Sequence, residues 1–516
     1  MFNKLRGLGG LVGPKVDHPL GDPRELRRIV DEIPGDNAFK ALDEVVGWLE
    51  SLQDARDFPE DRLYDAISRL DDAAQPHIKR LTWDYLHAPR ASHTEERRLW
   101  TICHGFWTVL AAGYERCLAA AGQKGRAGEQ IRVLLPALTA RLIAALGAVL
   151  KWERFRYGPS LGVLWQRLGS ALMFAENAGV ATRSIQLHAN VSGVSSAQQE
   201  FVKLVALHAA SVDSLLPLEI ELAERLIAHF LPGFVFSALT EHDSVYWVDL
   251  EIAQPPLRMA RMPAQSTPSQ RFFKPGSAHA GIAALLDDLE RGHDLPGDIN
   301  LGGQYFAKGL LPVLRHLAAY LAPVPPQRRH DRHGVKQRAI VLNGLASAYM
   351  AFSGQSRGLA DGAATENWVV EDVSHGGFGA VLNILPGDEW LKIGALVAMQ
   401  LEGGDNWVLG VVRRYHRSNK SEAHVGVETL ARQATPAELK PRAASSYAAL
   451  PGIRTLLIRD GNAPGEVRAV MLFASFDLRA TLEWNDGDKR IQLSPVALVE
   501  QGDDYEVARY RLGTIA

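Results

Sequence analysis

The amino-acid sequence predicts a multidomain α+β protein. A large, mainly α-helical N-terminal region precedes a small six-stranded antiparallel β-barrel and a C-terminal β-rich block. Three observations predict this order. Apolar residues recur at helical spacing through the first part of the chain. A proline-rich stretch at 322–327 then interrupts that pattern. Short β-prone runs separated by glycine-containing turns follow it.

The helical region is expected to span residues 1–321 and to be the output or partner-binding part of the molecule. A capping box at Ser92-His93-Thr94-Glu95 predicts the start of one helix. Residues 245–250 are typical of a strand. The spacing of apolar residues predicts further helices over 24–32, 38–52, 60–86, 129–152, 160–177, 197–230, 280–291 and 305–321.

Composition narrows the class of protein. The most apolar stretch, 133–150, contains Pro136 and Arg141, which favours a buried helix over a membrane span. The formal net charge of −3 argues against a nucleic acid polymer as partner. Two cysteines, Cys103 and Cys117, exclude a disulfide framework. With no long apolar segment at the N-terminus, these features lead us to expect a cytoplasmic protein.

The β-rich half is expected to begin after a linker at 322–333. A barrel at 334–432 and a small C-terminal domain at 445–516 follow, and a small-residue loop at 354–364 is expected to be mobile. The strands predicted for the barrel are 339–342, 368–370, 380–382, 396–401, 407–412 and 424–428. Those predicted for the C-terminal domain, which carries no motif that indicates chemistry, are 454–458, 469–473, 480–484 and 505–510.

Two short motifs indicate a site for an anionic nucleotide. Arg328 and Arg332 place two guanidinium groups on the linker, each planar and permanently charged. A guanidinium group can pair with two phosphate oxygens or with O6 and N7 of guanine. Asp372 and Ser374 occupy alternate strand positions and therefore share one face. A tight turn at Gly376-Gly377 follows them. Each motif alone is common, and the alternatives are a solvated basic linker and a self-capped turn.

Taken together, residues 326–432 resemble a PilZ domain, the bacterial receptor module for cyclic di-GMP. That family carries Arg-x-x-x-Arg before the barrel and Asp/Asn-x-Ser-x-x-Gly on an early strand. The later segments 410–414 and 425–428 also resemble its closing strands. The segment between the two motifs is longer than the family pattern suggests, because the 354–364 loop is inserted. The resemblance implies a ligand-binding set of Arg328, Arg329, Arg332, Asp372, Ser374, Gly376 and Gly377.

The expected function is that of a non-enzymatic bacterial signalling receptor for cyclic di-GMP, with no cofactor and no metal. Without ligand, the arginine-bearing segment 325–333 should be mobile, because its like charges repel one another and nothing packs against it. Ligand would order it and change the arrangement of the helical region. The resemblance implies motility, pili or exopolysaccharide as the regulated process, through a protein partner of the helical region.

Two alternatives stay open. One is a helical scaffold or adaptor protein whose barrel has lost ligand binding, and the other is an enzyme within the helical region. The sequence offers little for a metal-dependent enzyme, because His242-Asp243, His293-Asp294 and His330-Asp331 lack further ligands at helical spacing. The glycine-rich segment 7–13 has no preceding strand, which argues against a dinucleotide-binding loop.

Overall fold

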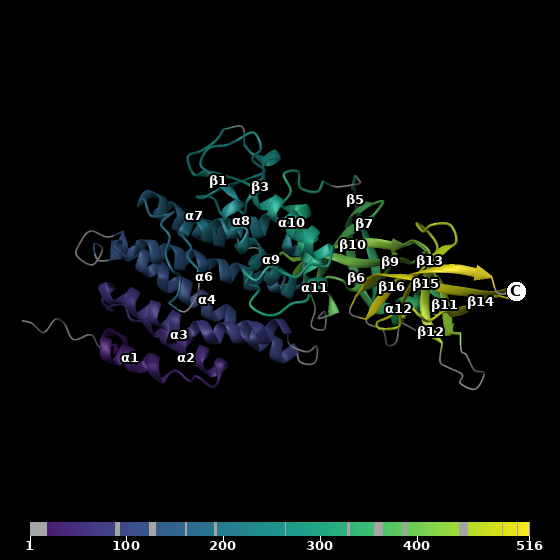
Figure 1. The fold of residues 1–516 in the computed structure, drawn as a ribbon, viewed down its shortest axis with the longest axis horizontal. Coiled ribbons are helices and arrows are strands. Elements are labelled where there is room, and N and C mark those ends of the chain that lie inside the picture. Colours follow the sequence, from purple (N-terminus) through teal and green to yellow (C-terminus); the bar gives the residue numbers. More distant parts are fainter. Residues whose placement is uncertain are drawn as a thin grey trace, which may run out of the picture. The chain divides into compact units, whose positions relative to one another are not determined.

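The computed structural model divides into two compact units. One contains the chain up to residue 326 apart from 157–159, and the other contains 157–159 together with 327–516. In Figure 1 the first unit runs from purple to teal, and residues 327–516 of the second run from green to yellow. The structure describes residues 18–87, 93–122, 129, 131–159, 162–189, 193–263, 265–327, 331–354, 365–384, 390–419, 421–442, 452–487, 489–502 and 504–514.

The first unit is mainly helical, as the sequence predicts. Its helices start at local signals: the Asp22 carboxylate accepts from the Arg24 N–H to cap α1, and the Asn37 side chain accepts from the Lys40 N–H to cap α2. Ser92 of the predicted capping box lies outside the described residues, and the helix expected after it begins at His93. The first helices are α1 (Pro23–Glu32), α2 (Ala38–Asp54), α3 (Glu60–His87), α4 (His93–Ala121), α6 (Leu135–Phe155) and α7 (Gly162–Asn177).

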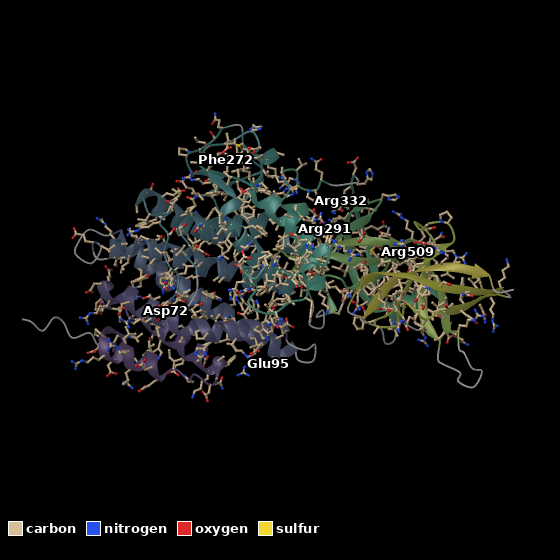
Figure 2. All side chains as sticks on the ribbon, in the orientation of Figure 1. Asp72, Glu95, Phe272, Arg291, Arg332 and Arg509 are labelled. Carbon is tan, nitrogen blue, oxygen red and sulfur yellow. The ribbon has the colours of Figure 1, made fainter. Side chains whose placement is uncertain are left out.

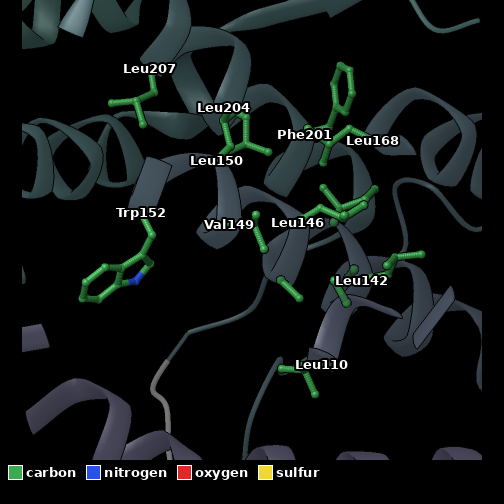
Figure 3. Close-up of a cluster of buried hydrophobic side chains, with 14 of the residues drawn as sticks. Leu110, Leu142, Leu146, Val149, Leu150, Trp152, Leu168, Phe201, Leu204 and Leu207 are labelled. Carbon is green, nitrogen blue, oxygen red and sulfur yellow. The ribbon is translucent and has the colours of Figure 1, made fainter. Parts of the chain in front are cut away.

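Helix α6 is the centre of the helical core. It packs against α4, α7 and α8 (Ala197–Ala209), and Figure 3 shows leucines of these helices in one cluster. Among the described helices, α6 is the one long and apolar enough to cross a membrane, yet 78% of its apolar window is buried inside the protein. Arg141 on this helix pairs with Asp72 at 3.0 Å. The prediction of a buried helix is confirmed.

The rest of the first unit departs from the sequence prediction in two places. Residues 197–230 do not form one helix: α8 ends at Ala209, Ser211 adopts a left-handed φ of 54°, and Pro217 opens α9 (Pro217–His229). The predicted strand 245–250 is observed as β2, but it belongs to a four-stranded antiparallel sheet, ordered β1-β4-β2-β3, whose other strands were not predicted. The remaining elements are β1 (Val235–Ser237), β2 (Tyr246–Asp249), β3 (Leu257–Arg258), β4 (Gln270–Lys274), α10 (Ala278–Glu290) and α11 (Ala307–Tyr320).

The second unit begins with a closed six-stranded antiparallel barrel, which confirms the predicted architecture. Its strand order is β10-β7-β6-β5-β8-β9. Alternate residues such as Phe378, Ala380 and Val425 fill its interior. A helix that the sequence did not predict, α12 (Gly344–Phe352), follows the first strand. The strands are β5 (His333–Asn343), β6 (Thr365–Ser374), β7 (Gly377–Asn383), β8 (Leu396–Leu401), β9 (Val408–Arg417) and β10 (Glu422–Ala431).

The C-terminal β-rich block is a second closed barrel, ordered β11-β12-β13-β16-β15-β14. Two of its strands were not predicted: β11 (Thr435–Pro441), which precedes the expected start of this domain at 445, and β15 (Lys489–Gln501). The predicted strands are observed as β12 (Ile453–Ile458), β13 (Glu466–Leu472), β14 (Leu482–Asp486) and β16 (Tyr505–Thr514).

The two barrels share a hydrophobic core within the second unit. Leu345 and Ala348 of α12 lie in one buried cluster with Leu409 of the first barrel and Tyr505 of the second. An ion pair adds to this contact, because Arg413 Nη2 lies 2.7 Å from Glu500 Oε2. The first barrel therefore has one part of its outer surface covered by the second barrel and α12.

Candidate ligand-binding site

The second sequence motif forms the hairpin that joins β6 to β7. Ser374 pairs with Gly377 across the strands, and the Ser374 hydroxyl donates to the Gly377 carbonyl at 3.1 Å. The Thr429 N–H fixes the turn from β10 by donating to the Gly376 carbonyl at 3.0 Å. A Cβ at position 377 would lie 2.1 Å from the Val427 carbonyl oxygen, so only glycine fits there.

Asp372 faces outward from β6 next to this hairpin. An irregularity in the β6–β7 register falls between Val370 and Asp372, and beyond it Asp372 pairs with Gly379. The Asp372 carboxylate accepts from the Gly379 N–H at 3.1 Å. A Cβ on Gly379 would lie 2.9 Å from both oxygens of the Asp372 carboxylate. Gly379 therefore clears space for the acidic side chain, a role that sequence reasoning missed, although a glycine inside a strand is a usable signal.

Arg332 reaches the same carboxylate from the residue before β5. His333 pairs with Val373 and Gly334 with Asp372, so the chain enters the barrel alongside the motif strand. Arg332 Nη1 donates to both Asp372 oxygens at 2.9 Å. Figure 2 labels Arg332 on the first barrel. The expectation that no group packs against this segment is wrong at Arg332, because the exposed Asp372 carboxylate offsets its charge.

The structure thus brings together Arg332, Asp372, Ser374, Gly376 and Gly377, five of the seven expected site residues. Arg328 and Arg329 lie outside the described residues, as do residues 355–364 of the expected loop. The Arg332 and Asp372 side chains are 33% and 30% exposed, so both are accessible to a ligand. The Ser374 hydroxyl uses its proton on Gly377 but keeps lone pairs that accept hydrogen bonds.

This arrangement suits a ligand that carries both donors and negative charge. A carboxylate accepts from paired N–H groups, and a guanidinium fork pairs with phosphate or with an acceptor edge of a base. Within the described ranges, no group of three or more His, Cys, Asp or Glu side chains gathers as a metal site would require. The side chains of this site can therefore accept hydrogen bonds from a ligand at Asp372 and pair with an anionic group at Arg332.

Comparison with known proteins adds information about the other unit. Residues 24–241 match a family model described as the cyclic-di-GMP receptor FimW, N-terminal domain. The matched segment covers less than half of the chain and includes α1 to α9. The helical region, for which sequence motifs indicated no family, is therefore similar to a domain of a cyclic-di-GMP receptor family. No relative was found among curated proteins.

Proposed function

We propose that this protein is a cyclic di-GMP receptor that binds its ligand on the outer face of the first barrel. The observation that carries the proposal is the contact between Arg332 and Asp372. These motif residues stand 40 positions apart in the chain, yet their charged groups lie 2.9 Å from each other on an accessible surface. The similarity of residues 24–241 to a cyclic-di-GMP receptor domain supports the same ligand from a separate part of the chain.

In the proposed complex each motif residue recognises a different part of the ligand. Asp372 accepts from the N1–H and N2–H of one guanine. The Ser374 hydroxyl accepts from a ribose hydroxyl, or turns its proton away from the Gly377 carbonyl to donate to a phosphate oxygen. Arg328 and Arg332 grip phosphate or the O6 and N7 edge of guanine, with Arg329 as a neighbouring contact. Gly376 and Gly377 keep the hairpin turn low, so that the ligand approaches the backbone.

Ligand binding breaks the Arg332–Asp372 ion pair and gives each of the two side chains a new partner. Ion pairs this exposed contribute roughly 0–1 kcal/mol, so the replacement costs little. A guanine that donates to Asp372, together with a phosphate that pairs with Arg332, satisfies both groups again. In the free protein the ion pair keeps the two side chains near the positions that binding requires.

The barrel is, in this proposal, a PilZ module, and the protein is a cytoplasmic bacterial signalling receptor without catalytic activity. The closed six-stranded barrel and the contact between the two motifs support this assignment. Ligand capture by the arginine-bearing segment changes the arrangement of the helical region, which contacts a protein partner. Regulation of motility, pili or exopolysaccharide is the proposed output.

Calorimetric titration of the full-length protein tests the ligand assignment. We expect saturable binding of cyclic di-GMP and no comparable binding of cyclic di-AMP, because adenine lacks the N1–H and N2–H donors that Asp372 requires. Failure to bind cyclic di-GMP would overturn the proposal. It would favour the alternative of a helical scaffold whose barrel has lost its ligand.

A further inference from the structure

A row of four outward-facing residues crosses the first barrel beside the candidate site. Asp372 on β6 pairs with Gly379 on β7, Gly379 pairs with Gly426 on β10, and Gly426 pairs with Arg414 on β9. Directly paired residues lie on the same face of a sheet. Their neighbours Ala380 and Val425 point into the barrel core, so this row faces outward.

The two central residues of the row, Gly379 and Gly426, carry no side chains. We call the backbone surface that they leave uncovered the floor. Glycine inside a strand weakens the strand and often marks the close approach of a ligand or another backbone. Intramolecular contacts account for Gly377 and Gly379, which would place a Cβ 2.1 Å from the Val427 carbonyl oxygen and 2.9 Å from the Asp372 carboxylate. Gly426 is under a weaker constraint. Its Cβ would lie 3.3 Å from the Arg414 Cβ, which a shift of a few tenths of an ångström relieves.

Arg414 forms the far edge of this floor. Its side chain is exposed, and its Cβ, Cγ and Cδ lie 3.3, 3.8 and 3.9 Å from the position of a Cβ on Gly426. The aliphatic stem of Arg414 therefore runs beside Gly426, on the strand of this row that is farthest from Asp372. Three interstrand intervals separate β6 from β9, which corresponds to roughly 14 Å along the barrel surface. That width suits a ligand of two nucleotides better than a mononucleotide.

We propose that Arg414 is a further ligand-binding residue, which contacts the half of the cyclic dinucleotide that lies away from Arg332. This inference rests on the proposed function and extends its site. One guanine pairs with Asp372, and the other lies over Gly426, where the Arg414 fork meets its O6 and N7 acceptors. A side chain at position 426 would lift that base from the floor.

The test is calorimetric titration of the full-length wild type, Arg414→Ala, Arg414→Lys and Gly426→Ala with cyclic di-GMP and with the hybrid cyclic GMP–AMP. We expect Arg414→Ala to weaken cyclic di-GMP binding about ten- to a hundredfold, the usual effect of losing a charge-assisted hydrogen bond. It should also reduce the preference for cyclic di-GMP over the hybrid. Arg414→Lys should lose the same preference, because lysine keeps the charge but not the fork.

Gly426→Ala should weaken binding while its melting temperature stays near that of the wild type. Arg511→Ala, which removes an exposed arginine from the second barrel, is the charge-matched control and should bind as the wild type does. If Arg332→Ala loses binding while Arg414→Ala and Gly426→Ala keep wild-type affinity, this inference fails and the proposed function stands. If the wild type does not bind cyclic di-GMP, both fail.

Discussion

Arg332 donates from one guanidinium nitrogen to both carboxylate oxygens of Asp372, with 2.9 Å for each contact. The antiparallel pairing of β5 with β6 produces this contact, because it sets His333 opposite Val373. Both side chains stay about one-third exposed. The barrel therefore holds a cation and a hydrogen-bond acceptor side by side on an accessible face.

Replacing Arg332 tests this contact as part of a ligand site. We expect Arg332→Ala to weaken cyclic di-GMP binding at least about tenfold, because it removes a charge-assisted hydrogen bond. Arg332→Lys should have an intermediate affinity, since it keeps charge without the planar fork. Calorimetry measures both, with Arg511→Ala as control. Wild-type affinity in Arg332→Ala would exclude a role for this arginine in the site.

Gly377 is expected to be required for the hairpin itself. In Gly377→Ala the new methyl would lie 2.1 Å from the Val427 carbonyl oxygen, so β10 or the hairpin has to move. Such overpacking destabilises by about 1–3 kcal/mol. Gly334→Ala is the matched control in the same barrel, because a Cβ there meets no atom within 4 Å. Equal melting temperatures for the two variants would contradict the steric argument.

His208 is expected to make the helical unit sensitive to acid. Burial and the nearby Arg154 charge lower the pKa of His208 from 6.5 to about 3. The Arg154 guanidinium lies 3.1 Å from Nδ1 of this histidine. In the unfolded chain His208 takes up a proton as the pH falls through 6.5, whereas in the folded protein it does not. Above pH 6.5 this histidine makes its full contribution to the free energy of unfolding. As the pH decreases from 6.5 towards 3, that contribution decreases by about 1.4 kcal/mol per pH unit.

Denaturant unfolding at a series of pH values measures this contribution. His208→Gln should show a shallower loss of stability on acidification than the wild type. His242→Gln is the control, because it replaces a histidine whose side chain is 96% exposed. A wild-type slope in His208→Gln would show that this histidine is protonated equally in the folded and unfolded states.

The ion pair between the barrels is expected to couple their stabilities. Arg413 binds Glu500 through two nitrogens at 2.7 Å and also contacts Glu428 at 2.6 Å. A double-mutant cycle of Arg413→Ala and Glu500→Ala, followed by denaturant unfolding, should give a coupling energy of about 0.5–3 kcal/mol. The more exposed Arg459–Asp486 pair should give a smaller value. Additive effects at Arg413 and Glu500 would mean that the pair contributes no coupling.

Sequence patterns predicted the elements whose signals are local. Strand β8 has the predicted limits, 396–401, because its apolar run ends at a glycine turn. The division of 197–230 into α8 and α9 was missed, because the apolar spacing continues through Pro217. Helix α12 is short and rich in small residues, so its pattern carries little periodic information.

The candidate site was predictable only as far as its motifs reach. Motif spacing and strand alternation indicated Asp372 and Ser374 on one face, and the order of the motifs suggested that Arg332 faces them. The Arg332–Asp372 ion pair itself depends on strand register, which sequence patterning leaves open. The hydrogen bonds between Arg413 and Glu500 join residues 87 positions apart, in different barrels. No local sequence pattern predicts such a contact.

The central claim is that the segment before β5 and the β6–β7 hairpin bind one dinucleotide together. Hydrogen exchange of the full-length protein with and without cyclic di-GMP measures this most directly. We predict slower exchange in both 331–334 and 372–379 on addition of ligand, and no such change in Arg332→Ala. Protection confined to other parts of the chain, or protection of the hairpin that persists unchanged in Arg332→Ala, would contradict the claim.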